Sequence, residues 1–269
     1  MIEIKNIKKV FNPRTVNEAI AINDLSLTVN DGDFITVIGG NGAGKSTLLN
    51  IIAGSLEVDE GMILIDGNNV LKLPEHKRAP YFGRVFQDPM KGTATDMTIL
   101  ENLALAKGRG SIHSLFHWSI SKNEKEEFIE LLKSLDLGLE NRIHEKVGLL
   151  SGGQRQALTL LMATLPTRKN TKPILLLDEH TAALDPKTAS KVLELTDKIV
   201  NEQKLTTIMI THNMSDAIKY GNRLIMMSHG QIIVDVTGEE KSKLTIESLL
   251  ELFNEKSHQD VLSDSTILG

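Results

Sequence analysis

A run of glycines that ends in a lysine and two hydroxyl residues carries the clearest chemistry in the sequence. Residues 39–47 (GGNGAGKST) fit the spacing G-x-x-x-x-G-K-[ST], with Gly39, Gly44, Lys45 and Ser46 at the fixed positions. Glycines let the backbone curl so that successive N–H groups point at phosphate oxygens, and a helix N-terminus adds a partial positive charge. We therefore expect this phosphate segment, residues 39–47, to hold the phosphates of a nucleotide.

The side chains of the phosphate segment suit different tasks. Lys45 can reach the β- and γ-phosphates, the Ser46 hydroxyl can bind Mg²⁺, and Thr47 is placed to contact the α-phosphate. The other positions expected to line the phosphates are Gly39, Asn41, Gly42, Ala43 and Gly44. The alternative is a glycine-rich turn with a surface lysine. The context disfavours it, because an apolar strand (residues 34–38) precedes the segment and a helix (residues 45–53) follows it.

Two carboxylates at the end of an apolar strand form a second candidate group. Residues 174–177 (ILLL) have the pattern of a buried parallel strand, and Asp178 and Glu179 follow directly. Ligands bind at the C-terminal ends of such strands. Asp178 would then hold Mg²⁺, and Glu179 would polarise the attacking water. The alternative, a strand that ends in solvent-facing acidic residues, is weakened by the presence of the phosphate segment.

Residues 150–154 (LSGGQ) form a second anion site, which has no lysine and no partner carboxylate. Ser151 is a good N-cap residue, and Gly152 and Gly153 leave backbone N–H groups uncovered beside Gln154. One nucleotide does not need two such sites in one chain, whereas two chains placed head to tail would need both. The alternative is an ordinary capped helix.

The elements that must position these groups alternate between strands and helices. Strands are expected at residues 2–10, 25–29, 62–65 and 206–210, and residues 224–227 and 231–236 read as a hairpin around His229 and Gly230. Helical periodicity dominates residues 98–165, where Leu100, Leu103 and Leu105 are expected on one helix. Further helices are expected at residues 189–200 and 244–253. The pattern predicts an α/β core interrupted by a helical insertion.

Two stretches carry no regular pattern. Residues 108–122 read as a loop that holds the only tryptophan, Trp118, beside His113 and His117. These side chains are interpreted as local packing and loop solvation, with a partner surface as the alternative. The polar composition of residues 254–269 predicts a loosely held tail.

Bulk composition narrows the possible functions. The chain has 269 residues, which suits one large α/β domain or a domain with a subdomain. A net charge of -5 provides no overall basic field for nucleic acid or an anionic membrane. The absence of cysteine excludes disulfides, thiolate nucleophiles and Cys-ligated zinc. The first residues (MIEIK) alternate apolar and polar and lack the continuous apolar stretch expected of a signal peptide, and no apolar run approaches the roughly 20 residues that span a bilayer. Any membrane role is therefore expected to act through a partner.

The LSGGQ string, taken with the phosphate segment and the two carboxylates, resembles the nucleotide-binding subunits of ABC transporters over residues 2–253. The resemblance implies an α/β fold: a P-loop NTPase (RecA-like) core with an antiparallel β subdomain and an inserted α-helical subdomain. Residues 1–88 and 167–253 would form the core, residues 89–166 the helical subdomain, and residues 254–269 the tail. It also implies ATP hydrolysis with ATP and Mg²⁺ bound.

Four more residues take roles by match to the family pattern. Gln87 fits the Q-loop glutamine, which reaches Mg²⁺ or the water, and His212 fits the switch histidine that contacts the γ-phosphate. Asp185 fits the D-loop, which crosses the dimer interface, and Phe11 fits the aromatic that stacks on adenine. Taken alone, Gln87 could be loop polarity, His212 a structural histidine and Phe11 a core residue.

The sequence departs from the family pattern near the second carboxylate. The family usually has Pro where this chain has His180 and often has Ser where it has Ala182, and residues 159–165 lack the arginine common after the LSGGQ helix. His180 could tune the surroundings of Glu179 or fill the Pro site, and the second interpretation is favoured. None of these departures removes a catalytic group.

The resemblance implies an assembly. ATP would lie between the phosphate segment of one subunit and Ser151 to Gln154 of another, so that a homodimer closes in the ATP-bound state. The ATPase would sit at the cytoplasmic face of the membrane and drive permease subunits docked beside residues 89–166. An extracytoplasmic solute-binding protein would be an indirect partner. Nucleic acid is not expected among the partners. The variant resembles importers of amino acids or similar small solutes.

Other ABC ATPases remain as alternatives. One is a mechanical, lipoprotein-release or cell-division subunit, and another is a soluble Fe–S assembly ATPase. A DNA-repair ATPase would need a long coiled coil between Lys45 and Ser151, but the gap is only about 100 residues and shows no sustained heptads.

Overall fold

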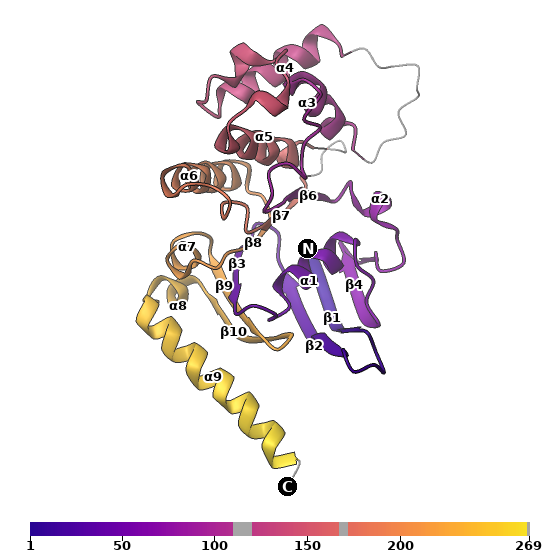
Figure 1. The fold of residues 1–269 in the computed structure, drawn as a ribbon, viewed down its shortest axis with the longest axis vertical. Coiled ribbons are helices and arrows are strands. Elements are labelled where there is room, and N and C mark those ends of the chain that lie inside the picture. Colours follow the sequence, from indigo (N-terminus) through magenta and orange to yellow (C-terminus); the bar gives the residue numbers. More distant parts are fainter. Residues whose placement is uncertain (110–119, 167–171, 268–269) are drawn as a thin grey trace. The chain divides into compact units, whose positions relative to one another are not determined.

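The computed structural model describes residues 1–109, 120–166 and 172–267, with side chains up to residue 256. The chain divides into two compact units (Figure 1). Unit 1 comprises Met1–Pro74 and Thr206–Gly269, and unit 2 comprises Glu75–Leu205. The predicted helical subdomain, residues 89–166, falls inside unit 2. Among the described residues, no helix combines the length and the apolarity needed to cross a bilayer.

Unit 1 contains an antiparallel sheet in the order β2 (Ala19–Val29), β1 (Ile2–Phe11), β4 (Glu60–Ile65) and β5 (Asn68–Asn69). In β1, Ile2 and Ile4 are buried while the residues between and after them are less so, which gives the alternation of a sheet with one apolar face. Asp66 and Gly67 both have positive φ, 48° and 77°, as a two-residue hairpin turn requires. The predicted antiparallel subdomain is therefore present.

A second group of strands in unit 1 carries the phosphate segment. Strand β3 (Phe34–Gly39) runs parallel to both β8 (Thr207–Ile210) and β9 (Arg223–Ser228), and β10 (Gln231–Thr237) pairs antiparallel with β9. Strand β3 is almost wholly buried, which explains its continuous apolar sequence. Helix α1 (Lys45–Ala53) follows, and Gly54 ends it with φ 86°, as the sequence predicts.

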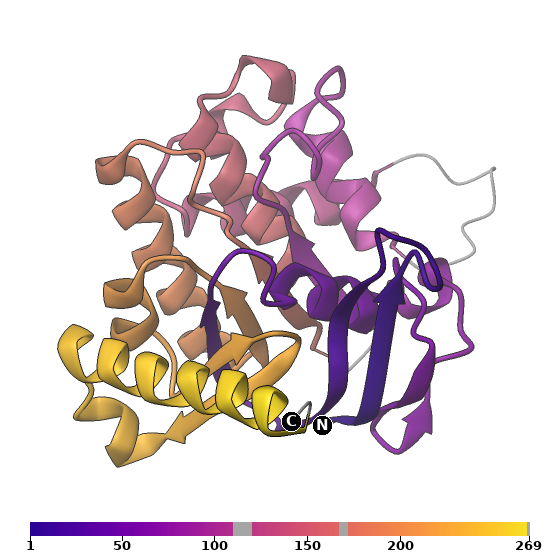
Figure 2. The ribbon, with the colours of Figure 1, turned by 60° about the horizontal axis from the view of Figure 1, so that its bottom comes forward.

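The remaining helices of unit 1 are α7 (Met214–Lys219), α8 (Gly238–Ser242) and α9 (Ile246–Ile267). Helices α7 and α9 and strands β9 and β10 share one apolar cluster, which includes Ala217, Leu224, Val234 and Leu249. Figure 2 shows α9, in yellow, beside β10.

The end of the chain differs from the prediction of a polar tail after residue 253. Helix α9 continues to Ile267. Its sequence contains no glycine or proline, so nothing in it breaks a helix, and polarity alone is a poor guide to a helix end. Helix α9 begins after Thr245, whose hydroxyl accepts a hydrogen bond from the Ser248 N–H at 3.1 Å.

Unit 2 contains the parallel pair β6 (Phe82–Val85) and β7 (Ile174–Asp178). Its helices are α2 (Glu75–Arg78), α3 (Ile99–Lys107), α4 (Lys122–Lys133), α5 (Gly152–Thr164) and α6 (Pro186–Gln203), with 3₁₀ turns at Leu139–Arg142 and Val147–Leu149. Helix α5 packs directly on β6. The two backbones are so close that a Cβ on Gly83 would fall 1.9 Å from the Ala163 carbonyl oxygen.

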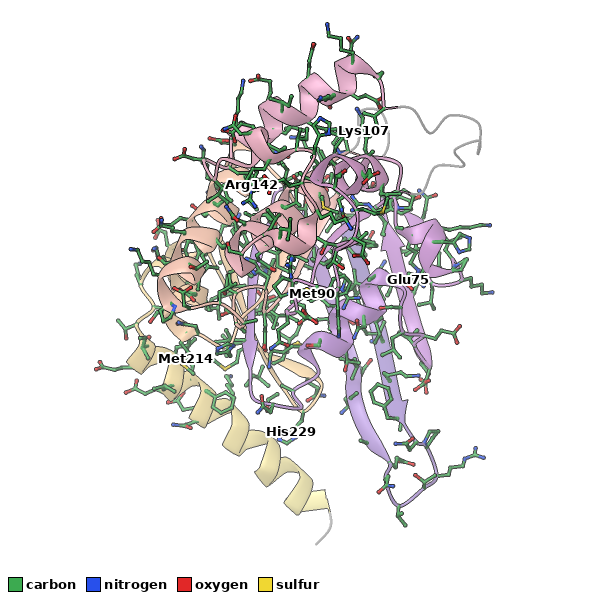
Figure 3. All side chains as sticks on the ribbon, turned by 45° about the horizontal axis from the view of Figure 1, so that its top comes forward. Glu75, Met90, Lys107, Arg142, Met214 and His229 are labelled. Carbon is green, nitrogen blue, oxygen red and sulfur yellow. The ribbon has the colours of Figure 1, made fainter. Side chains whose placement is uncertain are left out.

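Capping boxes at Thr98 and Ser121 begin α3 and α4. Leu100, Leu103 and Leu105 all lie on α3, as predicted; Leu103 is buried together with Ile99, whereas Leu105 is exposed. Lys107, labelled in Figure 3, ends α3 and pairs with Glu127 of α4 at 2.7 Å. Lys122 of the expected loop 108–122 already belongs to α4. Trp118, His113 and His117 lie outside the described residues.

Candidate nucleotide site

The phosphate segment follows β3 in unit 1, and two of its glycines are required by close packing. Gly39 has φ 153°, and a Cβ there would lie 2.3 Å from the Met227 carbonyl oxygen. Gly44 has φ 97°, and a Cβ there would lie 2.4 Å from the Ala21 carbonyl oxygen. By contrast, a Cβ on Gly40 or Gly42 would meet nothing within 4 Å. The segment is thus pinned at both ends and open along its middle, which is the shape that a phosphate group needs.

The Lys45 ammonium group lies over this segment. Lys45 is 8% exposed, and its Nζ donates hydrogen bonds to the carbonyl oxygens of Gly39 at 2.9 Å and Gly40 at 3.0 Å. A buried ammonium group is costly unless it is paired. The two carbonyls therefore hold the positive charge at the position where phosphate oxygens would compete for it.

His212 emerges at the same edge of the sheet as the phosphate segment. Strands β3 and β8 are parallel, with Val37 opposite Ile210, and the Thr211 N–H donates to the Val37 carbonyl at 3.1 Å. Asn213 then caps α7 by accepting from the Asp216 N–H at 3.2 Å, which fixes the turn that presents His212.

Asp216 is a titratable neighbour of His212. Burial raises the pKa of the Asp216 carboxyl, and the charges of Lys219 and His212 oppose that shift.

Phe11, the last residue of β1, is also in unit 1. Its side chain is 37% exposed, and the Lys9 ammonium lies 5.9 Å from the ring centroid. An exposed ring at a strand end is available for stacking. Phe11 is therefore not a core residue, which was the alternative interpretation of its sequence position.

Unit 2 holds the two carboxylates and Gln87. In the parallel pair β6–β7, Val85 lies opposite Leu177, so the loop that carries Gln87 and the residues Asp178 and Glu179 leave at the same edge. Gln87 is exposed, whereas Asp178 and Glu179 are half-buried. Glu179 has φ 46°, a left-handed conformation that is strained for a residue with a side chain.

Sequence reasoning missed Arg84, which lies beside Asp178. The Arg84 NH2 group is 3.8 Å from Asp178 Oδ2, and the guanidinium lies 4.6 Å from the Phe86 ring centroid. Burial lowers the pKa of Arg84, while Asp178 and Glu75 act in the opposite direction. The sequence signal that could have revealed this contact was a basic residue, Arg84, within the short strand that leads to Gln87.

The LSGGQ segment begins α5 as predicted. Ser151 and Gln154 form a capping box: the Gln154 N–H donates to Ser151 Oγ at 3.3 Å, and the Ser151 N–H donates to Gln154 Oε1 at 3.2 Å. Arg142 NH1 also donates to Gln154 Oε1 at 3.3 Å. The LSGGQ segment is therefore fixed by the side chains of Ser151 and Gln154 and by Arg142.

The same segment packs against the residues around Asp185, all within unit 2. A Cβ on Gly153 would lie 2.3 Å from Thr188 Cγ2, and one on Gly152 would lie 3.3 Å from Leu184 Cδ2. Asp185 caps α6 by accepting from the Thr188 N–H at 3.1 Å, and hydrogen bonds from the side chain and the backbone of Thr188 lower the pKa of its carboxyl. The structure thus brings Ser151 to Gln154 and Asp185 together.

Arg155 and Gln156, the next two residues of α5, were not singled out in the sequence. Gln156 is fully buried and donates through Nε2 to the Phe86 carbonyl at 3.3 Å. Arg155 donates to the Gly148 carbonyl at 3.2 Å and contacts the sulfur of Met90, which is labelled in Figure 3. They connect the LSGGQ helix to both ends of the Gln87 loop. A buried glutamine cannot be recognised from its spacing alone.

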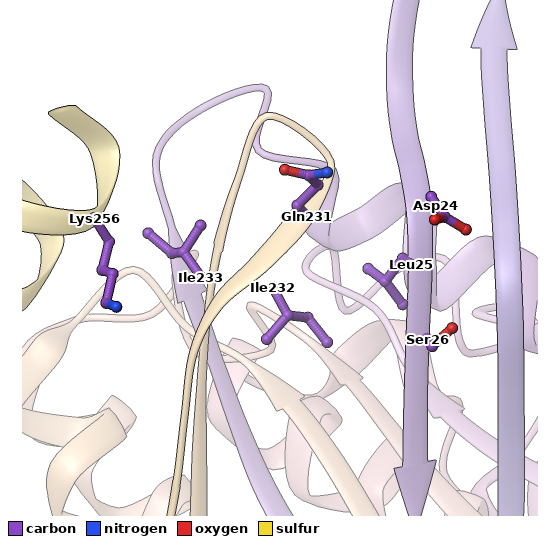
Figure 4. A pocket seen from close by; sticks show the side chains of 7 residues that line it. All are labelled: Asp24, Leu25, Ser26, Gln231, Ile232, Ile233 and Lys256. Carbon is purple, nitrogen blue, oxygen red and sulfur yellow. The ribbon is translucent and has the colours of Figure 1, made fainter. Parts of the chain in front are cut away.

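One further pocket of unit 1, of about 520 Å³, lies apart from these groups (Figure 4). It is lined by Asp24, Leu25, Ser26, Gln231, Ile232, Ile233 and Lys256. None of the predicted site residues lines it. Within the part of the chain that the structure describes, no three His, Cys, Asp or Glu residues gather as a metal site of their own.

Comparison with known proteins settles the family. The profile described as ABC transporter matches residues 22–182, which include the phosphate segment, the LSGGQ segment and both carboxylates. The chain belongs to the ABC transporter family. The predicted fold class, ATP binding and ATPase activity of an ABC transporter subunit are thereby confirmed.

The relatives are named as ATP-binding proteins of transport or import. The chain is 47% identical to a tyrosine transport ATP-binding protein of Clostridioides difficile, over 94% of this chain and 98% of that protein. It is 35% identical to the methionine import ATP-binding protein MetN 2 of Enterococcus faecalis, over 87% of this chain and 64% of the relative. A spermidine/putrescine import ATP-binding protein PotA of Haemophilus influenzae is 31% identical over 89% of this chain. The chain spans about three-fifths of the length of the last two relatives.

Solved structures of the family resemble this ABC transporter ATPase as well. A dimeric post-hydrolysis state of the ATP-binding cassette MJ0796, bound to ADP and Pi, superimposes with a TM-score of 0.73 at 28% identity. The match covers 88% of this chain and 98% of that one. The ADP conformation of the cassette MJ1267 gives a TM-score of 0.73 at 29% identity and covers 94% of this chain.

Proposed function

We propose that this ABC transporter ATPase drives the import of an amino acid, with tyrosine as the first solute to test. The observation that carries the proposal is the 47% identity to the tyrosine transport ATP-binding protein, which extends over nearly the whole of both chains. A second relative imports methionine, another amino acid. The ATPase does not contact the solute, so a permease and not the nucleotide site would determine which solute is transported.

The proposed catalytic unit is a homodimer. The phosphate segment of one subunit binds the ATP phosphates, and Ser151, Gly152, Gly153 and Gln154 of the second subunit cover the γ-phosphate. The rigid cap at Ser151 and the bare N–H groups of the two glycines support this role. The similar MJ0796 cassette is itself described as dimeric. Asp185, packed beside the same segment, would contact the partner subunit.

The residues of the phosphate segment fit a nucleotide, because Gly40 and Gly42 leave open space where Gly39 and Gly44 are tightly packed. Lys45 neutralises charge on the β- and γ-phosphates, and Phe11 stacks on adenine. Glu179 polarises the attacking water and accepts its proton, while His212 contacts the γ-phosphate. No covalent intermediate is needed, because phosphoryl transfer depends on positioning and charge stabilisation.

Ser46, Gln87 and Asp178 would hold Mg²⁺. Their hydroxyl, amide and carboxylate oxygens are the hard ligands that this cation prefers. When bound, Mg²⁺ neutralises charge on the β- and γ-phosphate oxygens. Gln87 also orients the attacking water.

The proposed partners follow from this role. Permease subunits dock on the helical subdomain, residues 89–166, at the cytoplasmic face of the membrane, and an extracytoplasmic solute-binding protein delivers the solute. The net charge of -5 disfavours nucleic acid as a partner. Residues 1–253 act as one ABC ATPase domain.

Solute uptake tests the proposal. Cells that lack the gene are expected to take up labelled tyrosine more slowly, and the wild-type gene but not its Glu179→Gln variant should restore the rate. Methionine and spermidine serve as comparison solutes. Unchanged uptake of every amino acid in the deletion strain, together with a lipoprotein-release or division defect, would reject import in favour of the mechanical role.

A further inference from the structure

A buried histidine follows the proposed base directly. His180 is 2% exposed, and its Nε2 lies 3.1 Å from Oγ1 of Thr196, in the middle of α6. Both residues belong to unit 2. A buried imidazole N–H needs a hydrogen-bond partner, and here that partner is supplied by a helix that begins several residues after His180.

The direction of this hydrogen bond follows from the Thr196 hydroxyl. Thr196 Oγ1 donates its single hydrogen to the Val192 carbonyl at 2.8 Å, as threonines in helices commonly do. It can therefore only accept from His180, so Nε2 carries the ring proton. The ring is thus held in one tautomer and one orientation.

The backbone beside His180 is strained. Glu179 has φ 46°, and its carbonyl accepts from the Ala182 N–H at 3.0 Å, so a tight turn follows the end of β7. The next turn, Leu184 N–H to Thr181 carbonyl at 3.1 Å, leads to Asp185 at the start of α6. Strained backbone persists only where its surroundings hold it. Strand β7 holds one side of Glu179, and the His180–Thr196 bond holds the other.

We infer that His180 is a positioning residue: its hydrogen bond to Thr196 ties the strained backbone at Glu179 to α6 and so sets the direction of the Glu179 carboxylate. The inference rests on the proposed role of Glu179 as the base. A proline at this position would restrict the backbone through its ring, whereas this chain uses a hydrogen bond to a distant helix. The bond also links the base to the helix that begins at Asp185.

The first experiment removes the acceptor and keeps its shape. Thr196→Val is expected to lower kcat about tenfold while KM for ATP changes by less than about twofold, because the base is misplaced but the phosphate segment is untouched. Thr196→Ser keeps the hydroxyl and should restore kcat to within about twofold of the wild type. Thr164→Val is the matched control, since Thr164 is also buried and donates to its own helix at 2.8 Å. Its kcat should not change.

A second variant separates positioning from folding. In His180→Leu/Thr196→Val both polar partners become apolar, so no buried polar group is left unpaired and Tm should recover relative to Thr196→Val. The inference requires that kcat stay reduced in this double variant, and that hydrogen exchange over residues 178–186 be faster than in the wild type.

Two results would overturn the inference in different ways. Wild-type kcat in the double variant, with Glu179→Gln inactive, would mean that His180 only packs, and the base assignment would stand. Wild-type turnover in Glu179→Gln would remove the base assignment and with it the role of His180.

Discussion

Gly153 of α5 touches Thr188 of α6 so closely that a Cβ on the glycine would lie 2.3 Å from Thr188 Cγ2. The contact places the LSGGQ segment against the helix capped by Asp185, 35 positions away in sequence (188 minus 153). These are the two parts of the chain proposed to meet the partner subunit. Because the LSGGQ segment and α6 pack on each other, a substitution in one is expected to displace the other.

This contact predicts a rescue experiment. Gly153→Ala should displace α6 and lower ATPase activity about tenfold, with a loss of roughly 1–3 kcal/mol in the free energy of unfolding from overpacking. Adding Thr188→Ser, which removes the clashing methyl group, should recover most of both. ATPase rates and thermal unfolding of the single and double variants measure the effect. Equal activity of the single and double variants would show that the contact with Thr188 is not what lowers the activity of Gly153→Ala.

Replacement of the proposed base predicts a trapped complex. Glu179→Gln removes the proton acceptor and keeps the shape, so ATP should still bind while turnover falls at least about a hundredfold. Size-exclusion chromatography with ATP should show a dimer that does not dissociate. Glu194→Gln, an exposed carboxylate on α6, is the control and should behave as wild type. Turnover at the wild-type rate in Glu179→Gln would rule out this base.

Head-to-tail closure is tested at the LSGGQ cap. Ser151→Arg places a bulky cation where the partner's nucleotide would lie, so ATP binding by the monomer should persist while ATP-driven dimerisation is lost. Ser121→Arg is matched, because Ser121 caps α4 with the same capping box. It should cost only about 1 kcal/mol of stability, the usual cost of losing a cap, and leave the dimer intact. Dimerisation of the Ser151 variant would reject the head-to-tail arrangement.

Lys241 predicts a pH dependence of stability. Its ammonium group is buried and donates to the carbonyls of Tyr220 and Gly221, and burial lowers its pKa from 10.5 to about 8. Between pH 8 and 10.5 the unfolded chain therefore binds more protons at this site than the folded protein, so this group makes the free energy of unfolding rise with pH. Below pH 8 both states are protonated and the contribution is constant.

The gain over this range should be roughly 1–3 kcal/mol. Urea unfolding of the wild type and Lys241→Met between pH 7 and 10 measures it. The difference in stability between the two proteins should change with pH, and parallel profiles would show that Lys241 does not titrate in this range.

Local features could be read from the sequence because their causes are local. Residues 45–53 form a helix that Gly54 ends, and Ser151 caps α5, as periodicity and capping chemistry predict. The spacing of Gly39, Gly44, Lys45 and Ser46 was sufficient to predict the phosphate segment because a strand-to-helix turn that holds phosphate needs these residue types at fixed positions. The contacts of Gly39 with Met227 and of Gly44 with Ala21 could not be predicted from that spacing. The extension of α9 to Ile267 was missed because polar composition was taken for the end of a helix.

The contacts of His180 with Thr196, Arg84 with Asp178 and Gly153 with Thr188 could come only from the tertiary structure. Each joins segments that are far apart in the chain, and spacing within one segment carries no information about which other segment will pack on it. The sequence by itself determined the chemical groups for holding phosphate and activating water. The tertiary structure decided how those groups are held: packing against Met227 and Ala21 fixes the phosphate segment, and the packing of α6 fixes the LSGGQ segment and His180, because burial of a histidine or a glycine depends on what surrounds it.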